Sequence, residues 1–184
     1  MTSVLLHCCC GPCATYSSRW LAEHDAEITA FWYNPNIHPF MEHQKRLESM
    51  QALAQQMGFP LIIDEGYDMP HYFSSIVGHE DNRCARCYQI RLNKTAQFAH
   101  ENGFDSFTTT LLISPYQNQD LIKEVGERAA HLNKTEFLFH DFREGFRESQ
   151  QMAKEFDLYR QKYCGCVYSE WERYSKVKVG GRGS

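Results

Sequence analysis

The chain has 184 residues, of which 42% are hydrophobic, and its formal net charge at pH 7 is −4. This length suits one globular domain that buries its own core, and no run of eighteen apolar residues is present to span a membrane. The slightly acidic charge excludes a uniformly basic nucleic-acid binder, although a net value does not reveal a local basic face.

The first seven residues have no basic segment ahead of a long apolar run, so they do not resemble a signal peptide. We therefore expect a cytoplasmic protein without a membrane partner. A single domain should cover residues 1–179, and the glycine-rich end at 180–184 should be a disordered tail.

In the first half of the chain, short apolar runs alternate with longer amphipathic stretches, which predicts strands and helices in turn. Pro12 should lie in the first turn of the first helix, and Gly58 should end the second. The prolines and asparagines of 34–39 predict a loop. The expected elements are a strand at 4–7, a helix at 14–23, a strand at 27–33, a helix at 42–57 and a strand at 60–64.

The second half continues this alternation. We expect a helix at 87–102, a strand at 106–112, a turn at 114–116, a helix at 120–132, a strand at 136–140 and helices at 143–163 and 167–176. The whole pattern predicts an α/β fold, a Rossmann-like doubly wound parallel sheet with a helical C-terminal region.

In an open parallel sheet, ligands bind beyond the carboxyl ends of the strands. The segments 8–13, 34–39 and 114–117 each follow a predicted strand, so they should meet at that edge. If the cysteines of 84–87 and 164–166 fold over the same edge, the thiols of three distant segments converge. We expect that convergence.

The eight cysteines are the most informative feature of the chain. They form three short motifs, which are CCCGPC at 8–13, CARC at 84–87 and CGC at 164–166. In a reducing compartment such spacings indicate metal thiolates or catalytic dithiols more often than structural disulfides.

Three kinds of site can be built from these motifs. A thioredoxin-like dithiol would use Cys10 and Cys13 between a strand and a helix, but it needs no further cysteines. A structural zinc ion needs four thiolates, fewer than the eight available. An iron–sulfur cluster with a second redox site uses more of them, and it is the interpretation that we favour from the chemistry alone.

Five motifs in order resemble the epoxyqueuosine reductases that do not use cobalamin, known as QueH. They are HCCCGPC at 7–13, YNPNIHP at 33–39, RCARC at 83–87, TTTLLISPY at 108–116 and YCGC at 163–166. The resemblance runs from residue 7 to about residue 171 and covers nearly the whole chain.

The resemblance implies reduction of epoxyqueuosine in tRNA to queuosine, the last step of queuosine formation. It also implies a [4Fe-4S] cluster beside a further redox or metal site, on a fold similar to the adenine nucleotide alpha-hydrolase group. The glycine-rich phosphate loop usual in that group is replaced here by residues 8–13, so we do not expect ATP to be used.

Within this resemblance, the simplest cluster ligands are Cys9, Cys10, Cys84 and Cys87, and Cys13 could equally replace Cys10. Cys164 and Cys166 would then be a redox-active pair or, with Cys13, ligands of a second, mononuclear iron. Cys8 is left off the ligand set, because a free cysteine at a strand end can pack as a hydrophobic residue.

The loop residues Asn34, Asn36 and His38 are candidates for binding the modified base, together with Ser114; the alternative is that the asparagines only shape a turn. Tyr116 is a candidate proton donor or a platform for a stacked base.

The expected partners are the anticodon loop of a tRNA that carries epoxyqueuosine and an electron donor such as a ferredoxin or flavodoxin. Five basic residues near the last cysteine motif could contact phosphates, although we expect most of them to form a solvated helix face. They are Arg143, Arg147, Arg160, Lys162 and Arg173.

Overall fold

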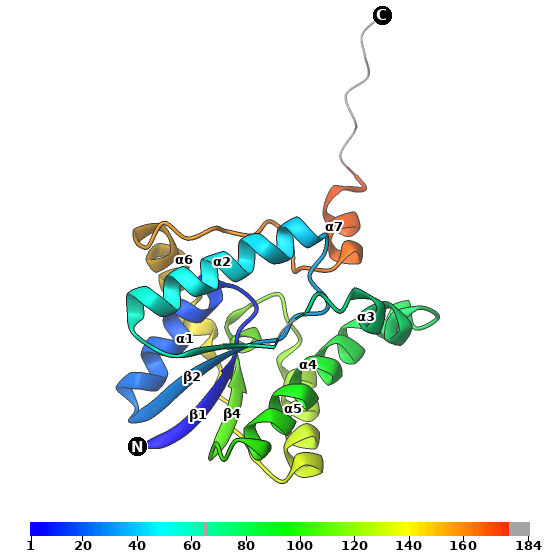
Figure 1. Cartoon of the computed structure of the whole chain (residues 1–184). Helices are drawn as coiled ribbons and strands as arrows, with labels where there is room; N and C mark the ends of the chain where they lie inside the picture. Colours follow the sequence, from blue (N-terminus) through cyan, green and yellow to red (C-terminus); the bar gives the residue numbers. More distant parts are fainter. Residues whose placement is uncertain (65, 177–184) are drawn as a thin grey trace, which may run out of the picture.

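The protein is described by a computed structural model that covers residues 1–64 and 66–176. Five parallel strands form one sheet in the order β3-β2-β1-β4-β5 (Figure 1). The strands are β1 (Thr2–His7), β2 (Ala26–Trp32), β3 (Leu61–Ile63), β4 (Ser106–Thr109) and β5 (Glu136–Phe137). The predicted α/β class is confirmed, and the predicted tail at 180–184 lies outside the described residues.

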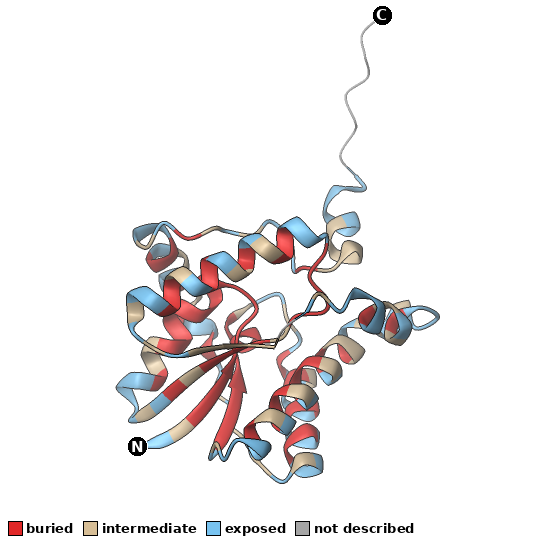
Figure 2. Ribbon diagram, in the orientation of Figure 1, coloured by how far each residue is buried: buried red, intermediate tan, exposed pale blue. Residues whose placement is uncertain are grey.

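The central strands are apolar on both faces because helices cover both sides of the sheet. Val4, Leu5 and Leu6 of β1 are all completely buried. Figure 2 shows the strands as a buried layer between helices whose outer surfaces are exposed. The core therefore lies on the two faces of β1 and its neighbours.

The helices form two layers. On one side α1 (Gly11–Glu23) packs against α2 (Phe40–Met57) and α6 (Phe146–Glu155), and on the other α4 (Arg83–Glu101) packs against α5 (Gln119–Asn133). Two short helices, α3 (Met69–Ile76) and α7 (Val167–Tyr174), lie beyond the carboxyl end of the sheet (Figure 1). Three 3-10 turns complete the described elements, namely η1 (Glu80–Asn82), η2 (Thr110–Ile113) and η3 (Phe142–Gly145).

Several predicted boundaries were wrong. The strand expected at 106–112 ends at Thr109, because the Thr109 hydroxyl accepts a hydrogen bond from the Leu111 amide and starts η2. The strand expected at 136–140 covers only two residues. The helix expected at 143–163 is only α6; Asp157 then takes a left-handed conformation, with φ of 51°, and the chain continues without regular structure.

Two differences bear on the site. Helix α4 begins at Arg83, four residues before the predicted start, so Cys84 and Cys87 both lie in its first two turns. Helix α3 was not predicted at all. By contrast, Gly58 ends α2 as expected, with φ of 75°.

The strand order places a topological switch point between β1 and β4. The chain leaves β1 toward β2 on one side, and later returns to form β4 on the other side of β1. Loops diverge at such a point and leave room for a ligand at the carboxyl ends of the two strands. Residues 8–10 and η2 lie there, directly after β1 and β4.

No helix in the described part of the chain combines the length and the apolar character needed to cross a membrane.

Candidate functional site

Three cysteine side chains meet at the switch point. The sulfur atoms of Cys9, Cys10 and Cys13 all lie within 4.8 Å of one another, and those of Cys9 and Cys10 are 3.9 Å apart. Cys10 caps the N-terminus of α1, where its sulfur accepts a hydrogen bond from the Cys13 amide. All three residues are buried. Buried thiols at these separations suit a soft metal ion or cluster.

The three thiols share protons unequally. Hydrogen bonds from Cys10 and Cys13 hold the pKa of Cys9 well below its usual value, and Arg91 lowers it further. Burial raises the pKa of Cys10, and the contacts with Cys10 and Cys9 raise that of Cys13. Of the three thiols, Cys9 is thus the one that loses its proton most readily. A thioredoxin-like site would need the opposite, a lowered pKa at the first cysteine of its CxxC motif.

Cys8 points away from these thiols. Its sulfur donates a hydrogen bond to the Leu6 carbonyl, 3.2 Å away, and the residue is completely buried. Burial raises the pKa of Cys8 well above its usual value. A neutral, packed side chain is the role that the sequence suggested.

Polar side chains from distant segments surround the three thiols. The Gln161 amide donates to Cys10 Sγ at 2.9 Å and lies 3.7 Å from Cys13 Sγ. The hydroxyl of Thr110, in η2, lies 3.5 Å from Cys9 Sγ. The site is therefore closed by β1, η2 and the irregular chain after α6.

The cysteines of the other two motifs lie close enough to interact electrostatically with one another, and Cys164 also interacts with Cys9. Burial is the main cause that raises the pKa of Cys87 to about 12; Arg91 opposes the rise, and the interactions with Cys164 and Cys166 add to it. Cys164 is exposed at the cleft, but the surrounding chain partly desolvates its sulfur and raises its pKa, with smaller contributions from Cys166 and Cys9. In the same way Cys166 adds to the raised pKa of Cys84. The structure thus brings all three motifs to one edge, although Cys84 and Cys87 do not join the 4.8 Å group.

Arg46 holds the segment that carries the last motif. Its guanidinium donates to the carbonyls of Tyr163 and Cys164 at 2.9 and 2.8 Å, and to the Glu42 carboxylate at 2.8 Å. Only 1% of Arg46 is exposed. Gly165 completes the contact, because its carbonyl accepts a hydrogen bond from the His38 amide at 2.8 Å.

A second buried guanidinium, that of Arg91, lies on the inner face of α4. It donates to Asn34 Oδ1 at 3.0 Å, and it lies 3.4 Å from His7 Nε2 and 3.9 Å from Cys87 Sγ. Burial and Arg91 together lower the pKa of His7 to about 3, so this histidine is neutral. Arg91 therefore ties α4 to the ends of β1 and β2.

The predicted base-binding residues fall into two groups. Asn34, Asn36 and His38 are almost completely buried. The side-chain amide of Asn34 donates a hydrogen bond to the Cys8 carbonyl and accepts one from Arg91. Ser114 and Tyr116 instead line an open cleft, where 85% of Tyr116 is exposed. The first group lies in the interior behind the site, and the second group lines the cleft, where a ligand can reach it.

That cleft has a volume of about 860 Å³, and Cys13, Gln161 and Cys164 contribute to its wall. Of the five basic residues considered from the sequence, Arg160, Lys162 and Arg173 also line it. Arg143 is instead paired with Asp141. A cleft with thiols in its wall and cations beside them can hold an anionic substrate over the cysteines.

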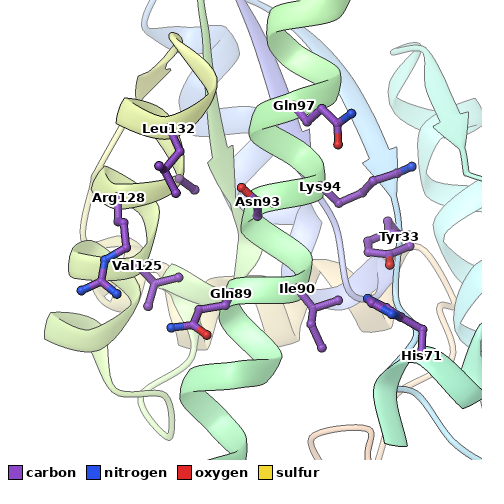
Figure 3. A pocket seen from close by; sticks show the side chains of 11 residues that line it. Tyr33, His71, Gln89, Ile90, Asn93, Lys94, Gln97, Val125, Arg128 and Leu132 are labelled. Atoms are coloured by element: carbon purple, nitrogen blue, oxygen red, sulfur yellow. The ribbon is translucent and has the colours of Figure 1, made fainter. Parts of the chain in front are cut away.

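A second groove, of about 580 Å³, lies over the outer surfaces of α4 and α5 (Figure 3). No cysteine lines it, and two of its basic side chains are paired, Lys94 with Asp64 and Arg128 with Glu124. This groove is separate from the thiol site.

Sequence reasoning missed several side chains of the site. Arg91 follows Cys87 by four residues, so the helical period alone puts both on one face. Arg46 and Glu42 interrupt the buried face of α2, which is a recognisable signal. Tyr72 gave no such signal, because α3 was not predicted. Burial is the main cause that raises the pKa of Tyr72, and its interactions with Cys166 and Cys87 add to the rise.

Comparison with known proteins gives a consistent result. The family model described as epoxyqueuosine reductase QueH matches residues 4–172. A protein of that name from Dehalococcoides mccartyi is 44% identical over 94% of this chain and 95% of its own length. Another, from Thermotoga maritima, is 35% identical over 96% of this chain and 94% of its own length.

Among solved structures, a predicted subunit of tRNA methyltransferase from Methanocaldococcus jannaschii is similar, with a TM-score of 0.54. The alignment covers 84% of this chain and 77% of that chain at 12% identity, which supports the fold alone. The family match, the relatives and the buried thiols lead to one conclusion. The chain belongs to the epoxyqueuosine reductase QueH family of oxidoreductases.

Proposed function

We propose that this protein reduces epoxyqueuosine in tRNA to queuosine, the last step of queuosine biosynthesis. The observation that carries the proposal is the group of buried thiols of Cys9, Cys10 and Cys13, one of which also lines an open cleft. Membership of the family supplies the reaction class, and the cleft supplies access to the thiols.

The reaction sets what the site must deliver. Removing the epoxide oxygen takes two electrons and two protons, leaves a carbon–carbon double bond and releases one water molecule. A single [4Fe-4S] cluster normally transfers one electron at a time. A second redox group beside the cluster therefore follows from the stoichiometry.

The cluster would be held by Cys9, Cys10, Cys84 and Cys87, with Cys13 as the neighbour that can replace Cys10. Thiolates are the ligands that such clusters take, and the buried cation of Arg91 suits an anionic group between these motifs. When bound, the cluster supplies electrons singly at low potential. The protein contributes the buried setting, and Thr110 and Gln161 hydrogen-bond the sulfurs.

Cys164 and Cys166 are the proposed second redox group. Oxidation of two thiols to a disulfide releases two electrons and two protons, which balances the reduction of one epoxide to an alkene and water. Cys164 lines the cleft, and its sulfur accepts a hydrogen bond from Gln117 at 3.4 Å. The alternative is that Cys164 and Cys166, together with Cys13, bind a mononuclear iron. In that case the protein would contain a fifth iron per chain.

The tRNA would enter the same cleft with its anticodon loop, whose bases are unpaired and can leave their stack at modest cost. Tyr116 is exposed on the rim, where it can stack on a base or donate a proton to the leaving oxygen. Ser114 lies beside it. Asn34, Asn36 and His38 support the base-binding wall from within, and a ferredoxin or flavodoxin would supply the electrons.

The test uses protein purified without oxygen and tRNA that carries epoxyqueuosine. After incubation with dithionite, nucleoside mass spectrometry should show loss of one oxygen atom from the modified base. The double variant Cys164→Ser, Cys166→Ser should form no queuosine, whereas Cys8→Ser should remain active. Normal turnover by the double variant would contradict the role of this pair, and an inactive wild-type protein with its cluster intact would contradict the function.

A further inference from the structure

Arg91 is an unusual buried charge. Its side chain is 1% exposed, and within residues 1–64 and 66–176 no carboxylate lies within salt-bridge distance of it. A guanidinium stays charged in proteins, and a buried charge without a counter-ion is strongly destabilising. The negative charge that offsets it must therefore come from another kind of group.

Cysteine sulfurs are the groups nearest to Arg91 that can carry a negative charge. Its Nη1 lies 3.9 Å from Cys87 Sγ, and the guanidinium also interacts electrostatically with the sulfurs of Cys9 and Cys164. The remaining contacts of Arg91 are neutral, namely Asn34 Oδ1 and the ring of His7. Arg91 therefore faces residues of all three cysteine motifs, and its charge is otherwise uncompensated.

The other buried arginine provides the contrast. Arg46 is equally buried, but its Nε is paired with the Glu42 carboxylate at 2.8 Å. Its remaining donors go to backbone carbonyls of the 163–164 segment. The charge of Arg46 is thus largely cancelled locally, whereas that of Arg91 is not.

We propose that Arg91 is a positioning residue that supplies the counter-charge of the iron–sulfur cluster and raises its reduction potential. This inference rests on the proposed function, because it needs a cluster between these motifs. A nearby cation stabilises the reduced cluster, which carries one more negative charge than the oxidised form. Arg91 would thereby make the cluster easier to reduce by a physiological donor.

The test is the midpoint potential of the cluster in protein without substrate, measured by redox poising with electron paramagnetic resonance. Arg91→Gln should shift the reduction equilibrium at least tenfold toward the oxidised form, about 59 mV for one electron. Arg91→Lys keeps the charge and should stay within about threefold of wild type. Arg128→Gln, an exposed change of the same charge on α5, is the control and should cause no shift.

A second variant keeps the test decisive if Arg91→Gln does not hold iron. Asn34→Asp leaves Arg91 in place but puts a carboxylate at the atom that it contacts at 3.0 Å, which should lower the potential in the same direction. An unchanged potential in Asn34→Asp or in a loaded Arg91→Gln would overturn the proposal. Wild-type protein that forms no cluster would instead overturn the proposed function.

Discussion

At the scale of single residues, neighbouring cysteines have different surroundings. Cys8 and Cys9 are adjacent in sequence, yet the first sulfur contacts the Leu6 carbonyl inside the core and the second lies within 4.8 Å of Cys10 and Cys13. Both residues follow β1, which ends at His7. The sequence predicts no ligand role for Cys8, because a free cysteine at a strand end can pack as a hydrophobic residue.

This division gives a matched pair of substitutions. Cys8→Ala should keep the iron of the wild-type protein and lose about 1 kcal/mol of unfolding free energy, as for a buried side chain without a ligand role. Cys9→Ala should lose most of its iron and sulfide. Metal analysis of both variants after anaerobic reconstitution checks the prediction, and equal iron content in the two would contradict it.

The shared protons of the three thiols predict a pH dependence for metal binding. The pKa values of Cys10 and Cys13 are raised, so a metal must displace a proton from each, whereas the pKa of Cys9 is lowered and this thiol loses its proton most readily. Affinity should therefore increase with pH, by roughly a hundredfold per unit while both protons are displaced. Cobalt(II) titration of the metal-free protein at several pH values measures this; a constant affinity would refute the proton sharing.

At the scale of elements, the segment that carries Cys164 and Cys166 depends on contacts that the sequence did not reveal. The sequence predicts a helix up to residue 163, but α6 ends at Glu155, and the segment 160–164 lines the cleft in an irregular conformation. Arg46 fixes it through the Tyr163 and Cys164 carbonyls. Local helix propensity cannot predict such long-range backbone contacts.

A substitution at Gly165 tests whether these contacts hold the segment that carries Cys164 and Cys166. Its φ is 149°, and a Cβ there would lie 3.2 Å from Ile37 Cγ1 and 3.4 Å from Arg46 Nη1. Gly165→Ala should destabilise the fold by about 1–3 kcal/mol and make Cys164 and Cys166 react faster with iodoacetamide. Gly58→Ala is the control, because φ is also positive but the space is open, so it should cost stability without changing thiol reactivity.

Chemical denaturation and timed alkylation measure the two effects separately. Equal alkylation rates in Gly165→Ala and Gly58→Ala would show that the segment is not held by its contacts with Ile37 and Arg46.

At the scale of the whole molecule, the sequence predicted the parallel sheet and the edge where the cysteines meet. Short buried strands alternating with amphipathic helices carry that information, and a doubly wound sheet then places the loops after β1 and β4 side by side. The buried charges were not predicted. Arg46 and Arg91 were not among the expected site residues, although their helical positions carried a signal, and the packing of α2 and α4 buries both.

The cleft also has consequences at this scale. Arg160, Lys162 and Arg173 surround it, so neutralising each one should weaken binding of the tRNA and reduce the salt dependence of its affinity by about one unit of slope. Filter binding at several salt concentrations measures both effects. Arg128→Gln, in the separate groove of α4 and α5, should leave them unchanged; an equal loss there would indicate that the cleft is not the tRNA site.

The central claim is that cysteines of the first two motifs hold an iron–sulfur cluster, with Cys164 and Cys166 as a second redox group beside it. Iron and acid-labile sulfide should be measured on anaerobically purified protein, with electron paramagnetic resonance before and after dithionite. We predict about four irons and four sulfides per chain and a signal that develops on reduction, as one [4Fe-4S] cluster requires. Zinc without sulfide, even after anaerobic reconstitution with iron and sulfide, would contradict the account.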